Sequence, residues 1–169
     1  MELVKCAKPL VTKKFGSIGI PHHMVADVHI LDVDMLAVSG INRIIWIDEA
    51  EFMSVVNETD AVIVQMPDSR TDYPIFEINL AKTIGLMANM RIVAGSLLGD
   101  LHFYNNDLGD MYYKLYADGM QFNYKPYCHS SNLANAVVVM DKMIKVDTIG
   151  FLTPINPVSE TAIHPIFVD

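Results

Sequence analysis

Apolar and polar residues alternate with a period of two along much of this chain, which is the pattern of half-buried β-strands. The alternation is clearest from Val25 to Val33 and from Ile75 to Leu80. Further short strands are expected at Glu2–Leu10, Met35–Val38, Arg43–Ile47, Ala61–Gln65, Arg91–Leu98, Met120–Tyr127, Ala136–Met140 and Ile144–Leu152. Many short strands in succession predict a domain that is built mainly from a β-sheet.

Two segments carry the signals of helices instead. Asp48 can cap a helix that runs to about Asn57, and Glu51, three residues after Asp48, can complete a capping box. The second helix follows Asp107, where apolar residues recur at the helical spacing i, i+3, i+4 and i+7: Leu108, Met111, Tyr112 and Leu115. Gly119 is expected to end this helix with a positive φ, which glycine adopts at little cost.

The organisation predicted for the whole chain is a single domain over residues 1–169, because no internal repeat or domain boundary interrupts it. Residues 11–23 contain two glycines and a proline and are expected to form an extended arm or loop. The fold class that follows is α+β, a mostly antiparallel sheet or small barrel with about two helices.

The composition favours a protein with partners. Hydrophobic residues make up 51% of the chain and charged residues 19%, which is more apolar than an ordinary soluble protein. We therefore expect surface that is buried against other proteins or against copies of this chain in a homo-oligomer. Charged residues interrupt every apolar run before it reaches the roughly 18 residues of a membrane span, and Met1–Lys8 lacks the apolar core of a secretory signal. We expect neither membrane insertion nor export.

Charge and cysteine content argue against several other classes. The formal net charge is −8, with 12 Lys and Arg against 20 Asp and Glu, so nucleic acid would be repelled on average. Cys6 and Cys128 lack the paired spacing of zinc or redox motifs and are expected as buried thiols in a reducing compartment. The glycines at positions 16 and 19 do not form a phosphate-binding loop, and we expect no cofactor.

The densest group of potential metal ligands lies between positions 22 and 34 and comprises His22, His23, Asp27, His29, Asp32 and Asp34. In an extended strand Asp32 and Asp34 share one face while His29 points to the other, so the ligands do not converge. A polar strand edge is the favoured interpretation. The weaker alternative is a metal site, as in a metal-dependent hydrolase, that uses His22, His23 and Asp32.

Two features could support covalent catalysis. Cys128, His129, Ser130 and Ser131 are consecutive, and Cys or Ser beside His is the material of a nucleophile and its base. Adjacent residues of a strand point to opposite faces, however, so a strand end followed by a polar turn is favoured. His102 has a side chain suited to a general base, but the sequence locates no partner for it.

From Arg91 onward the order of elements resembles that of the prohead proteases, the serine proteases that trim scaffold and capsid proteins of tailed-phage heads. The strand Arg91–Leu98 precedes the helix Gly109–Gly119, and a later strand from Ile144 leads into Pro154-Ile155-Asn156-Pro157. That last segment is similar to the Pro-Ala-Asn-Pro-like segment of the family and is the most specific match. The resemblance implies a prohead-protease-like fold.

The chain departs from the family at both catalytic positions. Where the family places its serine, after the helix, Met120–Pro126 contains no Ser, Thr or Cys. Where the family places its histidine, Ala61–Asp68 and the following Tyr73-Pro74-Ile75 contain no His. Acyl transfer by such an enzyme needs an activated hydroxyl within reach of a base, so the loss of both predicts a protein without protease activity.

The function expected from these observations is that of a pseudoenzyme: a structural or assembly component of a phage virion, in its head, connector or tail. Such a protein is made in the host cytoplasm and binds other virion proteins or copies of itself. The alternative is an active maturation protease that uses His102 or His129 with Ser130 or Ser131.

Overall fold

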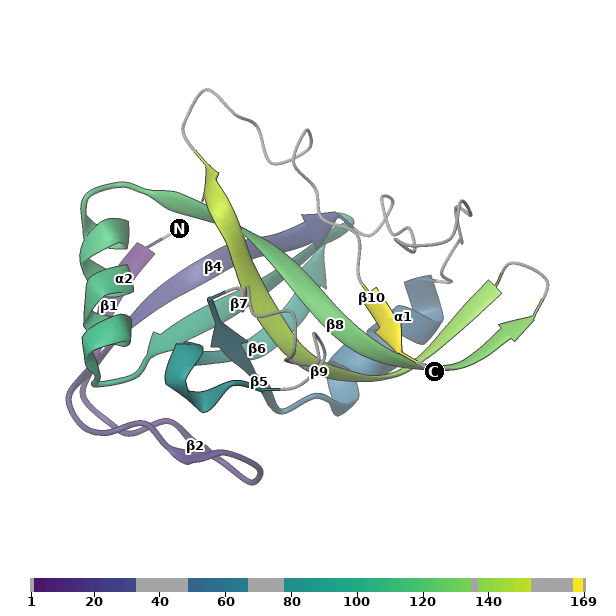
Figure 1. The fold of residues 1–169 in the computed structure, drawn as a ribbon, viewed down its shortest axis with the longest axis horizontal. Coiled ribbons are helices and arrows are strands. Elements are labelled where there is room, and N and C mark those ends of the chain that lie inside the picture. The colour runs from purple at the N-terminus through teal and green to yellow at the C-terminus, as the bar shows by residue number, and fades with distance from the viewer. Residues whose placement is uncertain (1, 33–48, 67–77, 135–136, 153–165, 169) are drawn as a thin grey trace.

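The computed structural model describes residues 2–32, 49–66, 78–134, 137–152 and 166–168. The two α-helices in these ranges are α1 (Glu49–Glu58) and α2 (Asp107–Ala117), and a short 3₁₀ helix, η2, spans Leu80–Lys82. The strands are β1 (Glu2–Cys6), β2 (Val11–Thr12), β3 (Gly16–Ser17), β4 (His22–Asp32), β5 (Ala61–Gln65), β6 (Thr83–Val93), β7 (Ser96–Phe103), β8 (Gln121–Ala134), β9 (Val137–Leu152) and β10 (Ile166–Val168). Figure 1 shows their arrangement.

Eight of these strands form one sheet in the order β1-β4-β7-β6-β5-β9-β8-β10. Most neighbours are antiparallel, but β5 pairs with β9 and β8 with β10 in parallel, so the sheet is mixed. The sheet curls, as Figure 1 shows, and β4 contacts β8 although four strands separate them in the sheet. The α+β class with two helices, expected from the sequence, is therefore confirmed in the described part of the chain, with a mixed and curled sheet.

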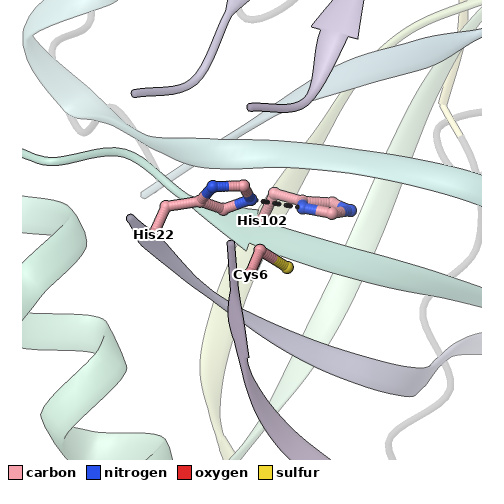
Figure 2. Close-up of side chains that lie close together, drawn as sticks. All are labelled: Cys6, His22 and His102. Atoms are coloured by element: carbon pink, nitrogen blue, oxygen red, sulfur yellow. Dashed lines mark hydrogen bonds between the residues drawn. The ribbon is translucent and has the colours of Figure 1, made fainter. Parts of the chain in front are cut away.

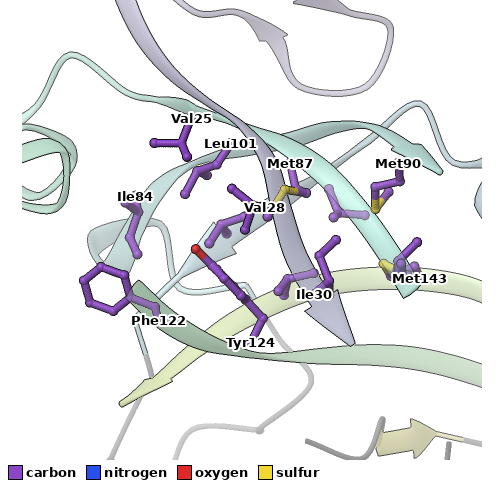
Figure 3. Close-up of a cluster of buried hydrophobic side chains, with 14 of the residues drawn as sticks. Val25, Val28, Ile30, Ile84, Met87, Met90, Leu101, Phe122, Tyr124 and Met143 are labelled. Atoms are coloured by element: carbon purple, nitrogen blue, oxygen red, sulfur yellow. The ribbon is translucent and has the colours of Figure 1, made fainter. Parts of the chain in front are cut away.

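The main hydrophobic core lies inside the curl. It joins residues of β4, such as Val25 and Val28, to residues of β6, β7, β8 and β9, as Figure 3 shows. Helix α2 adds two tyrosines to this core, and the rings of Tyr112 and Tyr116 lie 4.9 and 5.0 Å from that of Phe122 in β8. Each large apolar side chain that is buried contributes about 1.5–3 kcal/mol, so this core provides the main driving force for the curled shape.

Helix α2 begins and ends where the sequence predicts. The side chain of Asn106 accepts a hydrogen bond of 2.7 Å from the backbone N–H of Gly109, and acidic residues occupy the first turn. The helix ends before Gly119, which has a φ of +88°, and the backbone N–H of Met120 donates to Leu115. The predicted glycine stop is confirmed. Helix α1 also matches its prediction, while Asp48 lies outside the described residues.

Three predicted strands are wrong in their boundaries, and the first of them, Glu2–Leu10, ends at Cys6. Leu80 lies in η2, because the side chain of Asn79 accepts a hydrogen bond from the N–H of Ala81 and so caps a helical turn. The segment Arg91–Leu98 is not one strand but contains the turn between β6 and β7. Ala94 and Gly95 have φ values of +50° and +81° there, which suits a tight hairpin turn.

The three strands expected after Gly119 are two long ones in the structure, β8 and β9. The strands pair from Gln121 opposite Leu152 to Ala134 opposite Val137, with four shifts of register along the way. These irregularities let the polar segment from Ser130 to Asn132 continue the strand rather than end it. The strands expected at Met35–Val38 and Arg43–Ile47, and residues 75–77, lie outside the described part.

The segment expected as an arm, residues 11–23, has two parts. Strands β2 and β3 form a separate two-stranded ribbon, and His22 and His23 begin β4. The ribbon segment lies against the sheet of its own chain, since the buried Ile18 packs with Ile63 and Leu86. No helix among the described residues is long and apolar enough to span a membrane.

Candidate functional site

Three side chains that can bind metals meet on one face of the sheet, as Figure 2 shows: Cys6, His22 and His102. They come from the neighbouring strands β1, β4 and β7. Cys6 lies opposite His22 in the register of β1 and β4, and His102 lies opposite Met24, two residues along β4 from His22. Because residues i and i+2 of a strand share a face, this register brings the three residues to the same side.

The two histidines are joined by a hydrogen bond. The distance from His22 Nε2 to His102 Nδ1 is 2.9 Å, and His22 Nδ1 lies 3.1 Å from the carbonyl oxygen of Gly19. Since a carbonyl oxygen only accepts, His22 Nδ1 carries the proton and its Nε2 holds a lone pair. His102 Nδ1–H then donates to His22. One ligand atom from each of the three residues lies within 4.8 Å of the others.

Burial keeps the cluster uncharged. His22 is 1% exposed and His102 9%. Burial, followed by the electrostatic effect of the neighbouring His22, lowers the pKa of His102 to about 4, while the Asp100 carboxylate acts in the opposite direction. Burial also lowers the pKa of His22. The pKa of the half-buried Cys6 thiol is raised by burial and then by the Asp100 carboxylate. All three groups are therefore neutral at pH 7 when no ion is bound.

The surroundings of the histidines are apolar and tightly packed. Leu86 of β6 lies opposite His102 and belongs to the small buried cluster under the ribbon. Gly85, next to it, allows β6 and β7 to approach closely, because a Cβ at this position would lie 1.9 Å from the His102 carbonyl oxygen. The packing thus fixes the position of the His102 backbone and places the apolar Leu86 beside it.

The chemistry of this cluster is that of ligation rather than acyl transfer. A thiol and two imidazoles are the ligand types of zinc and related transition ions, whereas a cysteine nucleophile needs a lowered pKa and burial raises that of Cys6. His102, which we considered as a general base, directs its Nδ1 to His22. The sequence did not predict Cys6 as part of a site, since neither its spacing from His22 nor that from His102 forms a motif.

The metal ligands considered from the sequence are not brought together by the structure. His22 belongs to the cluster, but His23 faces the other side of β4, where its ring stacks on Tyr113 with 3.9 Å between centroids. Asp32 lies at the far end of β4, where it pairs with Ser96 of β7. It is about 33 Å along the strand from His22. Asp27 forms an ion pair with Arg91.

Three residues of the alternative catalytic site lie on one strand, and the fourth, His102, lies on another. His129 and Ser130 are in β8, opposite Lys142 and Met140 of β9, and Ser131 follows them. Their side chains lie outside the described part. His102 is in β7, and three strands separate β7 from β8 in the order of the sheet.

The strand that follows α2, where the sequence lacks the expected serine, is β8. Phe122, Asn123 and Tyr124 are all buried there. The neighbouring strand β9 contains a buried ion pair, in which Lys145 Nζ lies 3.4 Å from Asp147 Oδ1. Tyr127 of β8 contacts this pair, and burial, followed by the charge of Asp147 and its hydrogen bond, raises the pKa of Tyr127 to about 12.

This ion pair was not expected from the sequence. A lysine and an aspartate two residues apart in an apolar strand were its signal, since alternate residues share a face of the strand.

Comparison with protein-family models, with curated proteins and with solved structures found no match to this chain.

Proposed function

We propose that this chain is a structural or assembly component of a tailed-phage virion, built on a prohead-protease-like fold without catalytic activity. The observation that carries the proposal is an apolar surface on the ribbon segment and on η2. Val11 is 69% exposed, Ile20 56% and Leu80 75%. Single exposed apolar residues are ordinary, but three on neighbouring segments favour a docking surface.

The two segments that carry these residues adjoin each other. Gly19, beside Ile20, and Leu80 line the same shallow hollow of about 410 Å³. The N–H and C=O groups along one side of β1 add a second place for association, since β1 ends the sheet among the described strands. Partners are then other virion proteins or copies of this chain, which agrees with the high apolar content of the sequence.

The absence of catalysis is supported by the residues after α2. From Gln121 to Pro126 the strand contains no Ser, Thr or Cys. The amide of Asn123 is not a nucleophile, and the phenol of Tyr124 is fully buried with its pKa raised well above the usual value by burial. These groups are unsuited to attack a peptide bond.

The proposal is tested by counting the protein in finished particles. We expect a fixed copy number in purified virions of the phage that encodes it, equal to the number of subunits that a symmetric ring or shell contains. Specific interfaces bury about 1,200 Å² or more, which is enough to hold such a subunit through purification. Absence from the particles, or a trace that varies between preparations, would show that the protein is not a structural subunit.

A pair of variants locates the docking surface. Leu80→Asp places a charge on the exposed apolar surface and is expected to lower incorporation into particles at least several-fold, with the fold intact by circular dichroism. Met111→Asp is the matched control, because Met111 is 45% exposed on α2. Equal incorporation of the two variants would exclude the ribbon and η2 as the docking surface.

The protease alternative has its own test. Labelling of the purified protein by a fluorophosphonate, lost in Ser130→Ala or Ser131→Ala, would establish an active serine and reject the non-catalytic assignment.

A further inference from the structure

The cluster of Cys6, His22 and His102 is not explained by an assembly function. Buried histidines are uncommon in a core, and each usually hydrogen-bonds to a backbone or acidic group. Here two buried histidines bond to each other, and a thiol lies within 4.8 Å of both. Three soft or borderline ligands from three strands have therefore converged at one point of an apolar face.

We propose that Cys6, His22 and His102 bind one Zn²⁺ ion. Thiolate and imidazole are both ligands that zinc prefers, and zinc sites with three protein ligands leave the fourth position to water or to another ligand. Mg²⁺ and Ca²⁺ require oxygen ligands, which none of the three residues offers. The inference does not depend on whether the protein belongs to a virion.

The distances are close to those of a zinc site. In a tetrahedral site the two imidazole nitrogens lie about 3.3 Å apart and each lies about 3.6 Å from the sulfur. His22 Nε2 and His102 Nδ1 are 2.9 Å apart, and the three ligand atoms lie within 4.8 Å of one another. For an ion to replace the proton between the rings, the two nitrogens need to separate by a few tenths of an ångström and the sulfur needs to approach them by at most about 1.2 Å.

The hydrogen bond from His22 Nδ1 to the Gly19 carbonyl fits this arrangement. Ligating histidines usually donate their second N–H to a carbonyl or carboxylate, which fixes the ring and presents the other nitrogen to the metal. His102 binds the ion through Nδ1 after its proton moves to Nε2, which changes no net charge. Cys6 binds as a thiolate, and its proton is released to solvent.

The charge of the neighbourhood favours a cation. A Zn²⁺ ion with one thiolate carries a net charge of +1, and the Asp100 carboxylate acts electrostatically on both Cys6 and His102. Asp100 is itself held in place by Asn89 and Arg91, at 3.0 and 3.3 Å. The bound ion would fasten β1, which ends the sheet among the described strands, to β4 and β7.

The test uses the full chain after removal of metals with a chelator. We expect calorimetric titration with Zn²⁺ to give one ion per chain and Zn²⁺ to raise the thermal midpoint. Co²⁺ should give the visible bands of a tetrahedral site and a thiolate charge-transfer band. Cys6→Ser should remove the charge-transfer band, and His102→Gln should weaken Zn²⁺ binding about tenfold or more.

Two variants serve as matched controls. Cys128→Ser removes the other thiol of the chain, and His23→Gln removes the histidine that faces away from the cluster. Both should bind Zn²⁺ as the unaltered chain does. The proposal is overturned if the unaltered chain takes up no more Zn²⁺ than Cys6→Ser does, or if Cys128→Ser or His23→Gln abolishes binding.

A measurement on the unaltered chain covers the case in which the variants do not fold. Zn²⁺ should slow alkylation of Cys6, measured by mass spectrometry, relative to Cys128 as the internal reference. Equal alkylation of Cys6 with and without Zn²⁺ would overturn the proposal.

Discussion

Replacement of Asp147 by asparagine should destabilise the protein strongly, because it removes a charge from a buried ion pair. Lys145 and Asp147 are 1% and 3% exposed, and their charged atoms lie 3.4 Å apart. The two residues sit in β9 opposite Ile63 and Gln65 of β5, away from either end of the sheet. In Asp147→Asn the Lys145 ammonium keeps its burial but loses this counter-charge.

The size of the expected loss in stability follows from the interactions that the substitution removes and from those that remain. Breaking a buried pair by removing one partner typically costs about 3–5 kcal/mol. Two contacts remain in the variant: the Lys145 ammonium lies 4.6 Å from the centre of the Tyr127 ring, and the asparagine oxygen can still accept from the Tyr127 hydroxyl. We therefore expect the free energy of unfolding to fall by about 3 kcal/mol, near the lower end of that range.

Urea unfolding at pH 7, followed by circular dichroism, measures this loss. The control is Asp27→Asn, which removes the charge from an exposed pair with Arg91, where Asp27 is 59% exposed. An exposed pair contributes at most about 1 kcal/mol. Lys145→Met combined with Asp147→Asn should recover most of the stability, since no buried charge of the pair remains. If Asp147→Asn cost no more stability than Asp27→Asn, Lys145 would not be a buried ammonium that depends on the Asp147 charge.

Three further substitutions test local features by the same unfolding measurement. Gly119→Ala should cost about 1 kcal/mol, because the φ of +88° is strained for alanine although nothing lies near its Cβ; an unchanged stability would contradict this. Gly85→Ala should cost more, about 3 kcal/mol, because its Cβ meets the backbone carbonyl of His102, and a loss below that of Gly119→Ala would refute the close approach of β6 and β7. Asn106→Ala should cost about 1 kcal/mol through the lost cap of α2, whereas Asn106→Asp should retain most of the stability.

The elements that the sequence predicted well are those whose signals are local. The stripe of apolar residues after Asp107 and the glycine at position 119 define α2 within about a dozen residues, and the structure reproduces both ends. Ala61–Val64 is likewise apolar throughout, and Ala61–Gln65 is a strand with neighbours on both sides. Such segments need no knowledge of the rest of the chain.

The turn between β6 and β7 shows where local signals fail. Ala94 adopts a positive φ, which alanine rarely does, and the apolar run on both sides suggested one continuous strand. The hairpin forms because β6 and β7 pair along most of their length, from Gly85 opposite Phe103 to Val93 opposite Ser96. The stability of that long pairing outweighs the strain at one residue.

The cluster could not be found from the sequence for a related reason. The alternation of side chains along β4 correctly places His22 and His23 on opposite faces. For the same reason, the possible metal ligands of this one strand cannot converge on a single ion. The cluster instead runs across strands, and His22 and His102 are 80 positions apart. Only the order β1-β4-β7 and its register bring Cys6 beside them. Zn²⁺ binding that requires both Cys6 and His102 would therefore report on this strand order as well as on the site, because no other arrangement of neighbouring strands places β1 and β7 on the two sides of His22.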